Sequence, residues 1–191
     1  HGYVVFVTDA LYWGERSSEE AQEWSRLTFG QDKDKQTEAE AKTLKNTVYE
    51  GQRQIYEDCV REGREWAEKI LHDDMVSADF VASLPYVDEN RIGAFGFSMG
   101  AHRCWLLSAF SDRIKCGAAV CWMLMKEDYD SDNPSDLSMR ITSMRSKMDF
   151  PDIAAMLRPK PMYFVSGIND RLFPTESVEK AFSRMQEHYG D

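Results

Sequence analysis

The chain has 191 residues, of which 42% are hydrophobic and 12% aromatic, so its composition is that of a globular domain rather than a disordered segment. The formal net charge of −10 argues against nucleic acid as a partner, because a phosphate backbone attracts basic surfaces. It equally argues against an anionic membrane surface. No apolar run approaches the roughly 18 residues that a membrane-spanning helix requires.

Four short apolar runs predict buried parallel strands. They cover residues 3–8, 91–97, 115–122 and 161–166. Each run is apolar on both faces, which is typical of a sheet covered by helices on both sides.

Helical patterns separate these strands. They cover residues 17–27, 35–83, 98–110, 148–157 and 175–189, and we expect Gly51 and Gly63 to break the long second segment. Residues 127–147 are polar and predict an irregular loop or cap. Strands that alternate with helices predict an α/β fold with a doubly wound, mostly parallel sheet. In such sheets ligands bind at the carboxyl ends of the strands, so site residues should come just after strands.

The sequence Gly96-Phe97-Ser98-Met99-Gly100 follows the second predicted strand and opens a predicted helix. A Gly-x-Ser-x-Gly match alone is weak, but a strand before it and a helix after it are what a nucleophile elbow requires. The glycines allow a tight turn, and the helix N-terminus favours negative charge. We therefore predict that Ser98 is a nucleophile and that the N–H of Met99 stabilises an oxyanion. A glycine-rich turn with a capping serine is the structural alternative.

Asp170 comes just after the fourth predicted strand, at the same edge of the sheet as Ser98. The order of Ser and then Asp matches a triad in which the acid orients a histidine. A turn-forming aspartate is the alternative. Asp9 also follows a strand, but it precedes the nucleophile in the chain and is the weaker candidate.

A serine nucleophile needs a general base, and no histidine fits well. His188 follows Asp170 without an intervening strand, and His102 lies on the same predicted helix as Ser98. His72 lies among helical charges, and His1 is terminal. We therefore expect the catalytic histidine to lie outside this chain.

The four cysteines are Cys59, Cys104, Cys116 and Cys121. No Cys/His cluster has the spacing of zinc ligands, and no metal or organic cofactor is predicted. All four are expected to be small buried apolar residues.

These segments together resemble the dienelactone hydrolase and acetyl xylan esterase-like branch of the α/β hydrolases. The resemblance rests on residues 2–16, 88–100, 112–123, 151–161 and 170–174. It assigns Ser98 as nucleophile and Asp170 as acid. It places the histidine after a later strand and the second oxyanion donor after an earlier one. We therefore expect residues 1–191 to form a partial α/β-hydrolase domain that lacks the first strands and the last strand, with a helical insert at about 15–62.

The resemblance implies hydrolysis of a carboxylic ester through an acyl-enzyme, with a small ester as substrate and acetylated carbohydrate as the first candidate. A lactone hydrolase or a peptidase of the same fold is an alternative, and so is a catalytically silent scaffold with a binding role. Trp13 comes after the first predicted strand and Trp122 stands at the end of the third, and both are candidate walls of a substrate pocket. Packing in the core or in a cap is the alternative for both tryptophans.

Overall fold

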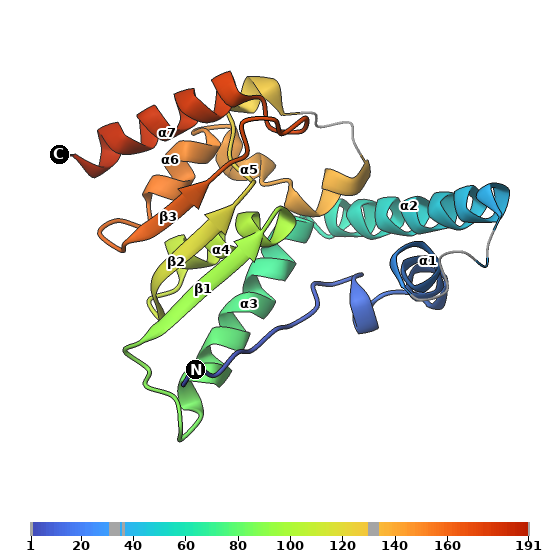
Figure 1. The fold of residues 1–191 in the computed structure, drawn as a ribbon, viewed down its shortest axis with the longest axis horizontal. Helices are drawn as coiled ribbons and strands as arrows, with labels where there is room; N and C mark the ends of the chain where they lie inside the picture. The colour runs from blue at the N-terminus through green and yellow to red at the C-terminus, as the bar shows by residue number, and fades with distance from the viewer. Residues whose placement is uncertain (1, 31–34, 36, 130–133, 191) are drawn as a thin grey trace. The chain divides into compact units, whose positions relative to one another are not determined.

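The computed structural model describes residues 2–30, 35, 37–129 and 134–190. It divides into two compact units (Figure 1). One comprises residues 1–6, 71–130 and 141–191 and holds the sheet, and we call it the sheet unit. The other, the helical unit, comprises residues 7–70 and 131–140.

The sheet unit contains three parallel strands in the order β1-β2-β3. They are β1 (Ile92–Phe97), β2 (Ile114–Val120) and β3 (Met162–Val165). Three of the four predicted strands are thereby confirmed. Parallel neighbours need crossover connections, and α4 (Met99–Phe110) supplies the first of them. Figure 1 shows the three arrows pointing the same way, so their carboxyl ends share one edge.

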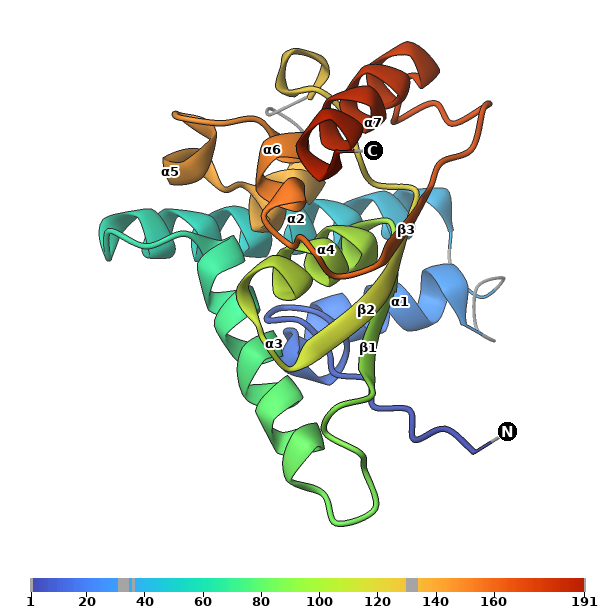
Figure 2. The ribbon, with the colours of Figure 1, turned by 90° about the vertical axis from the view of Figure 1, so that its left-hand side faces the viewer.

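Helices cover one face of this sheet (Figure 2). α4 packs on β1 and β2, and α6 (Phe150–Ala155) joins α4 to α7 (Thr175–Tyr189). On this face Ile92 and Ile114 pack against Ala78 of α3 (Trp66–Ser83). The opposite face carries Phe95, which is 77% exposed, and Tyr163, which is 68% exposed.

The predicted strand at residues 3–8 is wrong for this structure. Residues 2–10 form no regular element, and Tyr3, Val5 and Val7 are exposed to solvent. Apolar alternation alone does not make a strand, because the backbone N–H and C=O groups need a partner ladder. Within the described residues no strand pairs with this segment. Its nearest aromatic contact joins Phe6 to Phe80, with ring centroids 5.7 Å apart.

The helical unit contains α1 (Glu19–Phe29), α2 (Glu38–Arg61) and the first turn of α3. Gly63 separates α2 from α3 in a left-handed conformation with φ 70°, as predicted. The predicted break at Gly51 is wrong, because α2 continues through it. A Cβ at Gly51 would collide with the hydroxyl of Tyr12, which donates to the carbonyl of Val48 at 3.3 Å. Gly51 therefore leaves room for the side chain of Tyr12 and does not end the helix.

Residues 127–147 are more regular than the sequence predicts. The segment contains α5 (Thr142–Arg145) and 3-10 turns at Lys126–Asp128 and Pro134–Met139. Residues 130–133 of this predicted loop lie outside the described residues. No described helix is long and apolar enough to cross a bilayer.

Two of the four cysteines are buried as predicted. Cys59 and Cys104 lie in the core, and burial raises the pKa of Cys104 to about 12. Cys116 is exposed and Cys121 is half-buried, which contradicts the prediction for this pair. Cys116 faces the same side of the sheet as Phe95, and helices do not cover that side in the described residues.

Candidate active site

Ser98 lies at a sharp turn between β1 and α4. Its backbone has φ 53° and ψ −122°, a left-handed conformation that a residue with a side chain rarely adopts. Its amide donates a 2.8 Å hydrogen bond to the carbonyl of Val120 on the neighbouring strand. A Cβ at Gly96 would collide with the carbonyl oxygen of Gly100, so this turn requires glycine at position 96.

The hydroxyl of Ser98 makes no capping hydrogen bond to α4, although Ser98 is the N-cap residue. Its carbonyl instead accepts from the amides of Ala101 (2.8 Å) and His102 (3.2 Å). The alternative of a structural capping serine therefore loses its main support. The amide of Met99 begins α4, where the helix dipole favours a developing negative charge.

Helix α4 is held by a buried ion pair from α3. Asp74 is almost fully buried, and its carboxylate accepts from Arg103 Nε at 3.0 Å and from Nη2 at 2.6 Å. This two-point geometry fixes both position and rotation of the guanidinium. The pair thereby ties the helix that begins at Met99 to its neighbour.

Asp170 lies in the turn after β3 and is half-buried. Its Oδ1 accepts hydrogen bonds from the amides of Leu172 (2.9 Å) and Phe173 (3.4 Å). Its own amide donates to Gly167 O at 3.1 Å. Within the described residues Oδ2 accepts no hydrogen bond, which leaves one oxygen for an external donor. The turn-forming role and the role of a triad acid are thus compatible in this one carboxylate.

The middle strand connects these two loops. Ser98 bonds to the last residue of β2, and the next residue, Cys121, donates from its amide to Val165 O of β3 at 2.7 Å. Cys121 also has a positive φ, 58°. Residues in such strained conformations cluster at functional sites. Cys121 was not among the predicted site residues, because the predicted strand ran on to residue 122, whereas β2 ends at Val120 and places Cys121 just after a strand.

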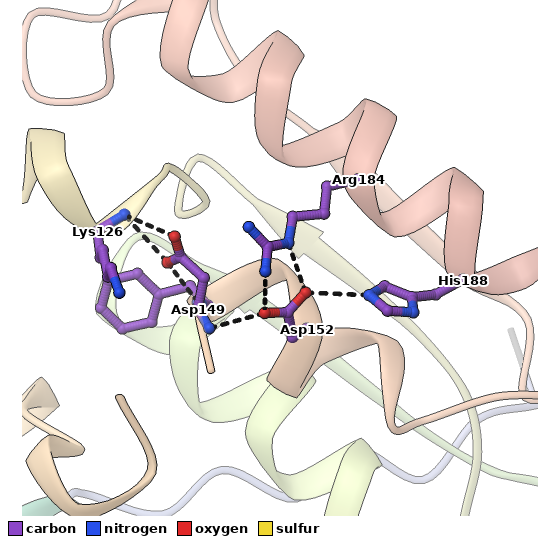
Figure 3. A network of polar contacts seen from close by, with 6 residues as sticks. Lys126, Asp149, Asp152, Arg184 and His188 are labelled. Carbon is purple, nitrogen blue, oxygen red and sulfur yellow. Dashed lines mark hydrogen bonds and ion pairs between the residues drawn. The ribbon is translucent and has the colours of Figure 1, made fainter. Parts of the chain in front are cut away.

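None of the described imidazole rings makes a hydrogen bond to Ser98 or Asp170. His188 Nε2 lies 3.0 Å from Asp152 Oδ1, beside the two bonds that Arg184 donates to the same carboxylate (Figure 3). The sequence did not single out Asp152, and its role is to join α6 to α7.

Two further histidines, His102 and His72, also have surroundings that do not suit a general base for Ser98. His102 is 2% exposed, and burial, with a smaller contribution from the Arg145 cation, lowers its pKa to about 3. It is therefore neutral at ordinary pH and is shielded from solvent. His72 is exposed beside Asp73, with 3.7 Å between Nδ1 and Oδ1.

The two candidate pocket tryptophans lie in different units. Trp122 is 2% exposed and packs against Phe150 and Phe173, with ring centroids 4.9 and 5.9 Å away. Trp13 is half-buried on Trp66 of the helical unit, with a centroid distance of 5.3 Å. The burial of Trp122 favours the core-packing alternative. Asp9, the weaker acid candidate, also belongs to the helical unit, and its Oδ2 accepts from Glu15 N at 3.0 Å.

The profile of the Dienelactone hydrolase family matches residues 1–189. The chain belongs to this family.

Individual proteins are also similar to this chain. A curated "Putative hydrolase YtaP" of Bacillus subtilis (strain 168) is 25% identical over 133 residues, which are 66% of this chain and 44% of that protein. Two structures of a glucuronoyl esterase from Solibacter usitatus superpose with TM-scores of 0.51 and 0.52, at 13% identity, over 64% of this chain and 36% of theirs. The chain thus spans less than half the length of these relatives, and the structures support the α/β-hydrolase fold.

This edge of the sheet carries two of the predicted site residues. It combines a strained serine at a helix N-terminus with a carboxylate after a nearby strand. Among the described residues no group of three or more His, Cys, Asp or Glu side chains is placed to hold a metal ion. The hydrolase family and the α/β fold with a parallel sheet are confirmed, whereas the described helices cover one face of the sheet and not the two faces predicted. The roles of individual residues remain predictions.

Proposed function

We propose that this chain carries the nucleophile and the acid of a serine-dependent hydrolase of carboxylic esters. The backbone of Ser98 is the observation that supports this most: φ 53° between a strand and a helix, with a hydroxyl that caps nothing. A buried structural serine gains nothing from this strain, whereas a nucleophile needs it to present Oγ at the sheet edge.

The proposed reaction proceeds through an acyl-enzyme. Ser98 Oγ attacks the ester carbonyl carbon while its proton passes to a histidine. The Met99 amide donates a hydrogen bond to the tetrahedral oxyanion. Collapse of this tetrahedral intermediate breaks the bond between the carbonyl carbon and the alcohol oxygen. The alcohol oxygen takes the proton from the histidinium as it leaves. Water then attacks the acyl carbon with the same histidine as base, and the free acid leaves Ser98.

The base in this proposal comes from outside the described residues. Asp170 would accept from the histidine on Oδ2, because Oδ1 already holds the turn. The second oxyanion donor would also come from outside these residues.

For the substrate we propose an ester of a carbohydrate, with an acetylated sugar as the first candidate. The solved structural neighbours are glucuronoyl esterases, which by name also act on an ester of a sugar acid. We expect short acyl groups to be released from sugar hydroxyls.

Fluorophosphonate labelling of the product of the complete reading frame tests the proposal. We expect one adduct on Ser98, together with hydrolysis of p-nitrophenyl acetate that Ser98→Ala abolishes. Intact, folded protein that is neither labelled nor active would favour the silent scaffold. That alternative draws its support from the histidines, because no described imidazole ring makes a hydrogen bond to the hydroxyl of Ser98.

A further inference from the structure

A cluster of buried aromatic side chains connects the loop of Ser98 to the loop of Asp170. Its centre is Trp122, the second residue after β2. Because β2 lies between β1 and β3, the chain at Trp122 emerges between the two loops that carry the proposed nucleophile and acid. The indole is 2% exposed, so its surface is used for packing.

On the nucleophile side Trp122 contacts His102. The imidazole lies in the first turn of α4, and its centroid is 4.5 Å from that of Trp122 at an interplanar angle of 68°. The amide of His102 donates to Ser98 O, so the imidazole and the elbow belong to one helical turn. The low pKa of His102 keeps this ring neutral, and a neutral ring packs between two indoles without the cost of a buried charge.

On the acid side Trp122 contacts Phe173. The two ring centroids are 5.9 Å apart, and Phe173 is buried. The amide of Phe173 donates to Asp170 Oδ1 at 3.4 Å. Movement of the Phe173 ring therefore moves a backbone group that holds the carboxylate.

We propose that Trp122 is a positioning residue, which sets the carboxylate of Asp170 against Ser98 through its contacts with Phe173 and His102. This proposal rests on the proposed function. It gives Trp122 a role other than a pocket wall, since a side chain this buried has little surface for a ligand. A displacement of about 1 Å at a catalytic group can cost roughly 10²-fold in rate, so a packing contact of this kind can control turnover.

Trp105 provides a matched control. It is fully buried in the same cluster and makes ring contacts with His102, Trp122 and Phe150. Trp105→Phe removes the same volume as Trp122→Phe but leaves the contact between Trp122 and Phe173 intact. The two substitutions should therefore perturb folding alike and catalysis differently.

The test measures kcat and KM for p-nitrophenyl acetate on the product of the complete reading frame, with and without Asp170→Asn. We expect Trp122→Phe to lower kcat roughly tenfold with KM unchanged within twofold, and Trp105→Phe to change neither. In the Asp170→Asn background Trp122→Phe should have no further effect, because the group that it positions is already lost. Phe173→Leu breaks the same contact from the other side and should reproduce the loss if Trp122→Phe does not fold.

Three results would overturn this role. They are an equal loss of kcat in Trp105→Phe, an undiminished effect of Trp122→Phe in the Asp170→Asn background, and a rise in KM alone, which indicates a substrate wall. Failure of the proposed function itself would look different: wild-type protein would show no turnover that Ser98→Ala removes, and the positioning role would fall with it.

Discussion

The amide of Ser98 donates a 2.8 Å hydrogen bond to the carbonyl of Val120, the last residue of β2. The following residue, Cys121, bonds in the same way to Val165 at the end of β3. The turn after β1 is thus held by a hydrogen bond to the end of β2, and the chain after β2 is held by a hydrogen bond to the end of β3. This arrangement lets Ser98 and Cys121 keep left-handed backbones at one edge of the sheet.

Gly96 should be indispensable to this turn, while Gly100 should not. In Gly96→Ala the new Cβ would collide with the carbonyl of Gly100 and lie 2.7 Å from the amide nitrogen of Ala101. We expect a loss of about 1–3 kcal/mol in the free energy of unfolding and loss of Ser98 labelling. Urea unfolding measures the first, and fluorophosphonate adducts measure the second.

Gly100→Ala is the matched control, because a Cβ there meets no described atom within 4 Å and the residue lies in α4. Alanine should leave the unfolding free energy unchanged or raise it by up to ~1 kcal/mol. Equal destabilisation by the two substitutions would contradict this account of the elbow.

His102 should make the stability of the protein depend on pH. Its pKa falls from 6.5 to about 3 on folding, so the unfolded chain binds a proton that the folded chain excludes. The contribution of neutral His102 to the free energy of unfolding is fully present above pH 6.5. It decreases by up to about 1.4 kcal/mol per pH unit as the pH falls toward 3. At pH 5 we expect a loss of about 2 kcal/mol relative to pH 7.5.

The variant His102→Phe removes this titration while keeping an aromatic ring in the cluster. Its unfolding free energy should depend less on pH than that of wild type between pH 7.5 and 5. Parallel curves for the two proteins would show that His102 is not buried as a neutral ring.

Asp152 should stabilise the sheet unit by joining α6 to α7. Burial opposes its ionisation, but hydrogen bonds from Arg184, the Asp149 amide and His188 outweigh this and lower its pKa. The ionised Asp152 carboxylate therefore contributes to the free energy of unfolding above the ordinary pKa of an aspartate. This contribution is lost as the pH falls through the lower pKa of the folded state. Asp152→Asn should cost about 2 kcal/mol in urea unfolding at pH 7.

Arg184→Met should cost at least as much as Asp152→Asn, because it leaves a carboxylate that is 9% exposed without its partner, whereas the guanidinium is 43% exposed and becomes hydrated when Asp152 is replaced. His188→Ala should leave the reactivity of Ser98 unchanged, since His188 contacts Asp152. A strong loss of labelling in His188→Ala would instead make it the missing base.

Local sequence patterns predicted the parts of the fold that local rules control. Apolar runs predicted the strands at residues 92–97, 114–120 and 162–165, and helices bury one face of the sheet that they form. The glycines around Ser98 signalled the tight turn because the close approach that excludes a Cβ at Gly96 is to Gly100, within the same five residues. Such features need no knowledge of distant contacts.

Features that depend on distant partners were not predictable. The segment at residues 3–8 has the pattern of a strand, but its state depends on whether another strand pairs with it. Gly51 marks the approach of Tyr12 from 39 positions earlier in the chain, a contact that no window of sequence contains. Trp122 follows a strand like a site residue, yet its burial depends on His102 and Phe173.

The central claim is that Ser98 is the nucleophile, and labelling with a fluorophosphonate followed by peptide mass spectrometry tests it most directly. On the product of the complete reading frame we predict a single stoichiometric adduct on Ser98. Labelling should be absent in Ser98→Ala and slowed at least tenfold in Asp170→Asn. An adduct on another residue, or ester hydrolysis that survives Ser98→Ala at the wild-type rate, would contradict the account.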